Sequence, residues 1–412
     1  MKTSLQSIAI SAVAKRLFIP RVYTHPSVNP AFNLKVQTGL HGFGHNTSAP
    51  RRLLFIYRNM TSLPTTQKGV LVSKIGGPEV LEYKTDLPVP SPKEGEVLVK
   101  NNLTAINLID TYFRKGVYDS TKPEILGKEG AGTIVALGPG PNPYNFAVGD
   151  RVAWIGTAGY AEYSTPPAYR VAKIPQGVSD EDVLAVLLTG ATCLSFIREA
   201  YEVKKGDWIL LHAAAGGAGI IMTQLLKLAG AKVIGTAGGP EKVELVRGLG
   251  ADVVIDYKNM EGAKWLDKVM EVTGGEGVNA VYDSVGKDTW EDSLKAVRRK
   301  GSVVFFGNSS GVVPPFPISM LAGKNIKICR PVLFNYIYTR EEFDLYMNEL
   351  FQLLEEGKLK TSIYKVYPLE DIQQAHQVGL PQVQSLSQIE KIDIIFNRHR
   401  ISKEGKQLAS CC

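Results

Sequence analysis

The stretch Trp208-Ile-Leu-Leu-His-Ala-Ala-Ala-Gly-Gly-Ala-Gly219 decides the fold of this chain, because a strand, a turn of small residues and a helix start follow one another in it. The apolar run Trp208–Leu211 is typical of a buried parallel strand. After the turn, apolar residues recur at helical spacing, at Met222, Leu225, Leu226 and Ala229. Gly230 then ends the helix.

The turn has the spacing of a phosphate-binding loop. Residues 214–219 fit the pattern G-x-G-x-x-G with alanine in the first place. Gly216 lets the backbone approach a pyrophosphate, and Gly219 lets the helix pack close to the strand. The pyrophosphate would lie at the helix N-terminus, where unpaired amides and the helix dipole attract negative charge. A degenerate glycine pattern also fits an ordinary tight turn, so the surrounding sequence has to decide.

The residues that follow repeat the same unit. Strands are expected at 232–237, 252–257, 279–284 and 302–307, and helices at 241–249, 265–272 and 290–297. This alternation predicts parallel βαβ units and therefore an α/β fold with a Rossmann-type, doubly wound parallel sheet. In that fold, the glycine turn is best interpreted as a dinucleotide site.

The second strand indicates which dinucleotide is bound. An NAD site places Asp or Glu about 20 residues beyond the glycines to hold the ribose 2′-hydroxyl. Here that position falls in Thr236-Ala-Gly-Gly239, which has no carboxylate. Lys242 follows, where it could meet a 2′-phosphate as a point charge. The prediction is NADPH, although Lys242 could also be a solvated helix residue beside Glu241.

Length and composition bound the class of protein. A chain of 412 residues with 44% hydrophobic residues can bury two cores, so two domains are expected. No uninterrupted apolar run approaches the roughly 18 residues of a membrane span, so none is predicted. The cysteines have no C-x-x-C spacing, which argues against a disulfide framework or zinc knuckle and favours a reducing compartment.

The basic charge is concentrated at the N-terminus. Residues 1–78 contain ten Lys or Arg and no Asp or Glu, although the whole chain carries a net charge of +7. Residues 1–60 are therefore interpreted as a basic extension that is disordered, untranslated or a transit peptide; Met1–Ile19 is Ser-rich and acid-free, and Met60 is a natural start. We expect a cytoplasmic protein, or a mitochondrial-matrix protein if residues 1–60 act as a transit peptide.

From about Gln67 the pattern changes to short strands separated by Gly, Pro and charged residues. Strands are expected at 70–75, 96–100, 132–137 and 151–155, and another begins at Gly159. A β-rich domain therefore precedes the nucleotide domain.

Several motifs in this order match one family: Gly76-Gly-Pro-Glu-Val-Leu81, Asn107-Leu-Ile-Asp-Thr-Tyr-Phe-Arg-Lys-Gly-Val-Tyr118, Gly127-Lys-Glu-Gly-Ala-Gly132, Ala213-Ala-Ala-Gly-Gly-Ala-Gly219, Tyr282-Asp-Ser-Val-Gly286 and Phe306-Gly-Asn-Ser-Ser-Gly311. The chain resembles the quinone oxidoreductases of the zeta-crystallin branch of the medium-chain dehydrogenases. The resemblance covers roughly residues 65–376. It implies a GroES-like, β-rich catalytic domain in two parts, 61–188 and 326–376, around a dinucleotide domain at 189–325, with the active site in the cleft between them.

The resemblance also bears on metal binding. Zinc-dependent relatives place a cysteine near the position of Asn107 and a histidine at that of Lys128, and they carry a four-cysteine lobe. A catalytic zinc needs three protein ligands, and Asp110, Glu129 and a distant histidine do not form a plausible set. Lys128 would also put positive charge where the cation should bind. No metal site is predicted.

Without a metal, the reaction depends on NADPH and on an acceptor that takes electrons readily, such as a quinone. The protein then has to hold the nicotinamide and the acceptor face to face. Asn107 is the candidate for a hydrogen bond to the nicotinamide ribose or the substrate. Tyr112 and Tyr118 offer flat surfaces for a planar acceptor and phenolic donors for its oxyanion. The alternative is that all three are ordinary packing residues.

The family places cofactor contacts in the nucleotide domain as well. Besides Gly219 and Asn107, the cofactor-binding residues implied are Gly216, Gly217, Lys242, Tyr257, Ser284, Phe306 and Asn308. His212 precedes the glycines within the first strand and is interpreted as a hydrogen-bonded core histidine. His376 is interpreted as structural.

The pattern breaks after His376. The family would continue to an Arg-x-Thr-x-Gly segment and a final apolar strand, whereas this chain breaks the helix at Gly379 and Pro381. Residues 377–412 therefore form an atypical tail, in which Ile392–Phe396 could replace the lost strand. The arginine that approaches the cofactor in the family is missing, and if Ile392–Phe396 does not replace the strand, the catalytic domain also loses a sheet edge.

Two other functions remain open. An NADPH-dependent enoyl or alkenal reductase shares the fold and the hydride chemistry, so the acceptor is a quinone or an enone. Zeta-crystallin relatives also bind AU-rich RNA, but the folded part shows no basic stripe and no aromatics interleaved with arginine, so any RNA binding should be weak. We also expect a homodimer.

Overall fold

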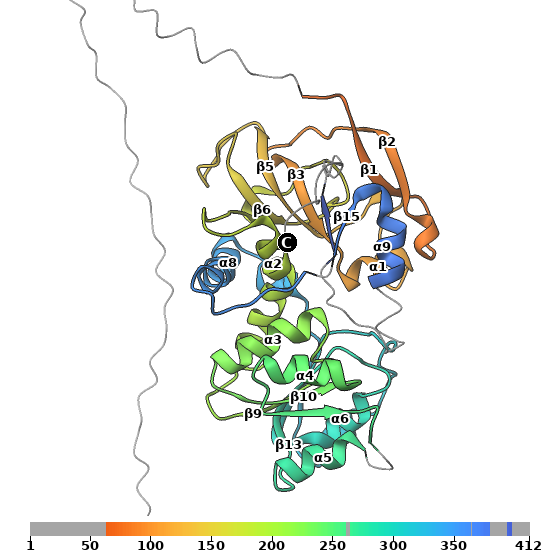
Figure 1. Ribbon diagram of the computed structural model, residues 1–412, viewed down its shortest axis with the longest axis vertical. Helices are drawn as coiled ribbons and strands as arrows, with labels where there is room; N and C mark the ends of the chain where they lie inside the picture. Colours follow the sequence, from red (N-terminus) through yellow and green to blue (C-terminus); the bar gives the residue numbers. More distant parts are fainter. Residues whose placement is uncertain (1–62, 261–263, 364, 380–393, 398–412) are drawn as a thin grey trace, which may run out of the picture. The chain divides into compact units, whose positions relative to one another are not determined.

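The computed structural model describes residues 63–260, 264–363, 365–379 and 394–397 (Figure 1). The transit-peptide prediction for residues 1–60 lies outside these residues, as does most of the atypical tail. The described chain contains a six-stranded parallel sheet and a β-rich part whose sheets are antiparallel except for one parallel pair of strands.

The parallel sheet has the strand order β11-β10-β9-β12-β13-β14. Its strands are β9 (Trp208–Leu211), β10 (Lys232–Ala237), β11 (Val253–Asp256), β12 (Val278–Asp283), β13 (Val297–Phe305) and β14 (Lys327–Cys329). The first strand in sequence, β9, lies in the middle and pairs in parallel with both β10 and β12. The strand order therefore reverses beside β9, which confirms the doubly wound sheet. In such sheets, ligands bind at the carboxyl ends of the strands beside this reversal.

Helices cover both faces of this sheet. They are α3 (Gly217–Leu228), α4 (Pro240–Gly248), α5 (Trp265–Val272) and α6 (Trp290–Ala296). Alternate residues of β9 enter different cores: Ile209 and Leu211 pack with α3, whereas Leu210 packs with residues of α5 and α6. A strand buried on both faces needs apolar side chains at every position, which explains the uninterrupted run in the sequence.

The β-rich part, as far as the structure describes it, consists of two sheets. The smaller has the order β2-β1-β4, and the larger the order β15-β16-β3-β5-β6-β8, with β7 also paired to β3. The strands of the smaller sheet are β1 (Thr66–Val72), β2 (Glu82–Pro88) and β4 (Glu124–Ile125). Those of the larger sheet are β3 (Val97–Ala105), β5 (Glu129–Leu137), β6 (Arg151–Ile155), β7 (Tyr163–Ser164), β8 (Val171–Lys173), β15 (Lys365–Pro368) and β16 (Ile394–Asn397).

Helices connect the two parts. The chain leaves the β-rich part through α2 (Asp180–Ser195), which packs on α3 and on α8 (Arg340–Glu355), and returns through α7 (Leu333–Tyr336), β15 and α9 (Ile372–Gly379). A short helix after β3, α1 (Leu108–Arg114), is an element that the sequence pattern did not predict. The domain boundaries stay a prediction: α2 runs across residue 188, and β14 follows residue 325.

One described helix, Asp180–Ala200, is long and apolar enough to cross a bilayer by length and composition. However, 67% of its most apolar window is buried inside the protein, as in a core helix. In the sequence, charged residues on both sides limit the uncharged stretch to 183–197, and Thr, Gly and Ser interrupt its apolar run.

The C-terminal strand distinguishes between two alternatives. Strand β16 pairs in parallel with β15, with Ile394 opposite Lys365, and antiparallel with β3, with Ile395 opposite Ala105. Of the two alternatives, the replacement of the lost strand by the segment around Ile392–Phe396 is therefore confirmed, and the loss of a sheet edge is not. Strand pairing uses backbone groups, so a segment with another sequence can fill the place. The family's Arg-x-Thr-x-Gly segment has no counterpart among the described residues.

Candidate active site

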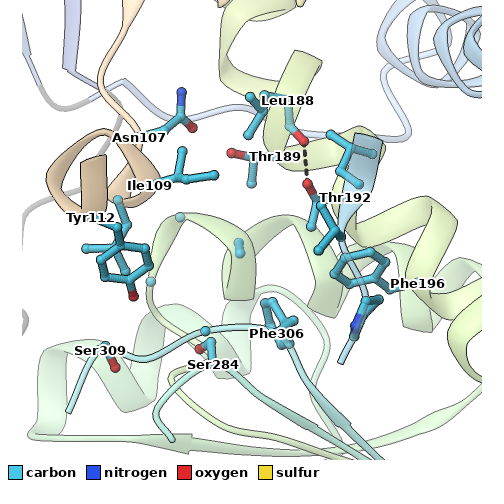
Figure 2. Close-up of a pocket in the computed structure, with 18 of the residues that line it drawn as sticks. Asn107, Ile109, Tyr112, Leu188, Thr189, Thr192, Phe196, Ser284, Phe306 and Ser309 are labelled. Atoms are coloured by element: carbon cyan, nitrogen blue, oxygen red, sulfur yellow. Dashed lines mark hydrogen bonds between the residues drawn. The ribbon is translucent and has the colours of Figure 1, made fainter. Parts of the chain in front are cut away.

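A cavity of about 340 Å³ lies where the carboxyl ends of the central parallel strands face α1 and α2 (Figure 2). Eight of the residues predicted from the sequence line it: Asn107, Tyr112, Tyr118, Gly216, Gly217, Gly219, Ser284 and Phe306. Most of the other lining residues are apolar or small. The structure thus brings together segments that lie far apart along the chain.

The glycine turn forms one wall of the cavity. Gly216 is the N-cap of α3, so the amides of the first turn of this helix have no intrahelical partner. At Gly219, a Cβ atom would overlap the backbone carbonyl oxygen of Ala213. Ala213 itself has a φ of 51°, a conformation that non-glycine residues rarely adopt. The start of α3 therefore lies in close contact with the turn that follows β9.

Asn107 enters the cavity from the start of α1. Its backbone N–H donates to Asp110 Oδ2 at 2.8 Å, which caps the helix. Its side-chain Nδ2 donates to Glu129 Oε1 at 2.7 Å. Both contacts fix the residue at the edge of the cavity.

Tyr112 and Tyr118 meet edge to face, with ring centres 5.3 Å apart. The Tyr112 hydroxyl accepts a hydrogen bond from the Asn308 backbone N–H at 3.1 Å, and the Tyr118 hydroxyl accepts one from Arg330 at 3.2 Å. Asn308 and Arg330 follow β13 and β14. The two tyrosines therefore bridge the β-rich part and the parallel sheet, and burial raises the pKa of Tyr112.

Lys242 and Tyr257 lie away from this cavity, after β10 and β11. The side chain of Lys242 is 5% exposed, and its Nζ has no hydrogen-bond partner among the described residues. Burial, together with the nearby Lys258, lowers the pKa of Lys242 to about 8. The ring of Tyr257 lies so close to Gly238 that a Cβ there would be 2.8 Å from its hydroxyl. An unpaired buried ammonium is costly, so this position suits an anion.

The position considered for a metal holds other groups. Lys128 Nζ lies 4.0 Å from the centre of the Phe113 ring. Among residues that the structure describes, no three His, Cys, Asp or Glu side chains group closely enough to hold a metal.

The two histidines behave as expected of core residues. His212 Nδ1 lies 3.1 Å from Thr236 Oγ1, and its Nε2 lies 3.1 Å from Ser293 Oγ. Burial lowers its pKa, and the interpretation as a hydrogen-bonded core histidine is confirmed. His376 Nε2 lies 3.2 Å from the Tyr160 hydroxyl, and burial lowers its pKa to about 3.

Two residues at the cavity were not predicted from the sequence as part of the site. Among the described residues that line the cavity, Arg330 is the only charged one. No sequence signal marks it, because it lies outside every motif. Glu129 lies within the Gly127–Gly132 motif but was weighed only as a metal ligand; it is a buried carboxyl bonded to Asn107.

Comparisons with known proteins show what the chain is similar to. Residues 93–176 match the family described as alcohol dehydrogenase GroES-like domain, and residues 217–352 match the family described as zinc-binding dehydrogenase. The chain is 40% identical over 314 residues to the quinone oxidoreductase of Pseudomonas aeruginosa, covering 75% of this chain and 94% of the relative. It is also 40% identical over 311 residues to quinone oxidoreductase 1 of Escherichia coli, covering 74% and 93%.

A solved structure, that of Escherichia coli quinone oxidoreductase complexed with NADPH, matches with a TM-score of 0.74 and 38% identity. The match covers 80% of this chain and 99% of that one.

Proposed function

Because the chain belongs to the quinone oxidoreductase family of the medium-chain dehydrogenases, we propose that its cavity is where reducing equivalents pass from NADPH to a quinone. The observation that carries the proposal is the place of the cavity. It is bounded on one side by the glycine turn and on the other by Asn107, Tyr112 and Tyr118. A nicotinamide and a planar acceptor would meet between these walls.

The described residues fit a phosphorylated dinucleotide. The free amides at the start of α3 suit the pyrophosphate, which would lie against Gly216, Gly217 and Gly219. The unpaired Nζ of Lys242 suits the 2′-phosphate, and Tyr257 lies beside Gly238 at the same edge of the sheet. Further contacts are proposed for Ser284, Phe306 and Asn308. When bound, NADPH would supply the hydride.

The other residues would contact the acceptor and stabilise the negative charge that develops on it. Tyr112 and Tyr118 offer aromatic surface beside the nicotinamide position, and Arg330 places positive charge at the same cavity. Negative charge develops on the acceptor oxygen as it is reduced, and a fixed cation and phenolic hydroxyl stabilise that charge. The reduced oxygens can take protons from water, so a strong general acid is not required. No metal is proposed.

The test is NADPH oxidation, followed by absorbance, with a panel of quinones and a matched panel of enones. We expect kcat/KM to be higher for quinones. Arg330→Ala should lower kcat/KM about tenfold or more, the loss of one charged hydrogen bond, whereas exposed Arg247→Ala should not. Faster turnover of enones would instead establish an alkenal reductase.

We also infer a homodimer from the edge of the parallel sheet. Within the described chain, β14 is the last strand in the sheet order, and its surroundings expose Ile318, Met320 and Ile328. An unpaired apolar edge favours pairing with a second copy. Light scattering should give the mass of a dimer. Ile328→Lys should give the mass of a monomer, whereas Val148→Lys, the control, should remain a dimer. RNA binding stays an untested hypothesis that no described contact favours.

A further inference from the structure

Glu129, the first residue of β5, is a carboxyl buried beside the cavity without lining it. The residue is 1% exposed. Its Oε1 accepts from Asn107 Nδ2 at 2.7 Å, and its Oε2 accepts from the Leu188 backbone N–H at 2.9 Å. Its backbone carbonyl accepts from Thr104 Oγ1 at 2.7 Å. The carboxyl is thus held between α1 and α2, the two helices that face the cavity.

Among the described residues, no cation compensates this buried carboxyl. The neighbouring Lys128 lies over the Phe113 ring, and the charged group that shifts the pKa of Glu129 is Asp110, which raises it by repulsion. Burial, with a smaller contribution from Asp110, raises the pKa of Glu129 to about 7. Packing alone would be served better by an apolar side chain, since a buried unpaired carboxyl destabilises the fold.

The geometry determines which end of Asn107 faces the cavity. An asparagine amide offers two N–H donors at one end and an oxygen acceptor at the other. A carboxylate can only accept, so Glu129 takes the nitrogen end. Figure 2 shows the amide nitrogen of Asn107 pointing away from the other labelled side chains, with the oxygen on their side.

We propose that Glu129 is a positioning residue that turns the Asn107 amide so that Oδ1 faces the cavity and accepts a hydrogen bond from a hydroxyl of the nicotinamide ribose. This inference rests on the proposed function, because it assumes that a dinucleotide occupies the cavity. A protonated Glu129 would donate to Asn107 Oδ1 instead. The amide would then turn round and present its N–H groups.

Other ionisable groups lie near Glu129 and have to be separated from it. They are Asp110 on α1, Lys128, which precedes Glu129 in the chain, and Tyr160, whose hydroxyl donates to Asp110 at 2.8 Å. Between Val183 and Thr192, α2 contributes no ionisable side chain. Removing the charge of Asp110 should lower the pKa of Glu129 and move any pH effect without abolishing it.

The experiment measures the Kd of NADH by fluorescence between pH 5.5 and 8.5, without an acceptor. NADH is used because it has no 2′-phosphate to titrate or to engage Lys242. We expect the affinity of the unmodified protein to rise across pH 7. In Glu129→Gln, the affinity should be about tenfold lower at pH 8 and independent of pH, with a similar melting temperature. In Asp110→Asn, the affinity for NADH should still rise with pH, but the rise should occur at a lower pH than in the unmodified protein.

A double variant separates positioning from mere structural support. In Glu129→Gln combined with Asn107→Asp, the introduced glutamine can donate to the introduced carboxylate and still accept from the Leu188 N–H, and an oxygen again faces the cavity. We expect this pair to recover at least part of the lost affinity. If Glu129→Gln leaves the Kd and its pH dependence unchanged, or if the double variant binds no better, the inference is wrong. Normal NADH binding without quinone turnover would instead contradict the proposed function alone.

Discussion

Lys242 lies at the start of α4 with its ammonium group buried and without a hydrogen-bond partner among the described residues. The sequence suggested only that it could meet a phosphate or be solvated. Burial argues against the second alternative, because a solvated helix lysine would be exposed. The lowered pKa, about 8, also makes its charge sensitive to pH near neutrality. Because the buried ammonium of Lys242 has no hydrogen-bond partner among the described residues, it is available to bind an anion.

This leads to a prediction about pH. The 2′-phosphate of NADPH binds the charged form of Lys242, so the contribution of this contact is fully present below the pKa and is lost as the pH rises through it. The Kd for NADPH should rise about tenfold between pH 7 and pH 9, whereas that for NADH should not change through this contact.

The matched variant is Lys242→Ala. It should remove both this pH dependence and most of the preference for NADPH over NADH, expected to be at least about tenfold. Lys268→Ala, at an exposed position on α5, is the control. Equal affinities for the two cofactors in the unmodified protein would overturn the prediction.

At the scale of elements, two packing contacts define the site. The helix α3 lies so close to the turn that follows β9 that Gly219 has no room for a side chain. The strand β16 fills the place between β15 and β3, so that β3, which leads into Asn107 and α1, is paired on both sides. The first contact shapes the phosphate loop, and the second supports the opposite wall of the cavity.

Gly219→Ala should disturb the first contact. The added Cβ forces α3 away from the Ala213 carbonyl, which should lower the free energy of unfolding by about 1 to 3 kcal/mol and weaken NADPH binding. Gly248→Ala, at a helix position with open space around it, should be neutral or stabilising. Denaturant unfolding and cofactor titration of both variants check this; equal effects would show that the close approach is unimportant.

Ile395→Pro should disturb the second contact. Proline removes a backbone N–H from the middle of β16, which should cost about 1 to 3 kcal/mol of stability and favour aggregation through the exposed edges. Ile395→Thr changes the same side chain but keeps the backbone N–H, so this variant should lose much less stability. Thermal unfolding that does not distinguish the two variants would mean that the strand pairing contributes little to stability.

At the scale of the whole molecule, the cavity exists because the chain crosses from the β-rich part to the parallel sheet and returns. Tyr112 reaches Asn308, 196 residues further along the chain, and Tyr118 reaches Arg330, 212 residues further along. These two hydrogen bonds connect the walls of the cavity. The arrangement brings the proposed acceptor and nicotinamide positions together.

We expect the protein to reduce quinones without a bound metal. Dialysis against a chelator should leave kcat and KM for quinone reduction unchanged, and elemental analysis should find far less than one zinc per chain. The reason is the family resemblance, which sets Asn107 and Lys128 against a cysteine and a histidine of the zinc-dependent relatives, and Lys128 is a cation. Stoichiometric zinc together with loss of activity on chelation would contradict this.

The sequence by itself determined the parallel sheet and its order of elements. Apolar runs such as Trp208–Leu211 and helical repeats between them are local patterns, and the glycine spacing marks a close backbone approach that no other residue allows. The motifs carried by Asn107, Tyr112 and Tyr118 also predicted much of the cavity wall, and all three residues line the cavity.

Only the tertiary structure decided the rest. The partner of Asn107 is Glu129, the contacts of Tyr118 include Arg330, and β16 pairs with β3, a strand from the opposite end of the described chain. None of these contacts leaves a periodic pattern, because each depends on where distant segments meet rather than on local spacing. The shifted pKa values of Glu129 and Lys242 could not be predicted from the sequence either. Burial shifts both pKa values, and burial is a property of the folded chain.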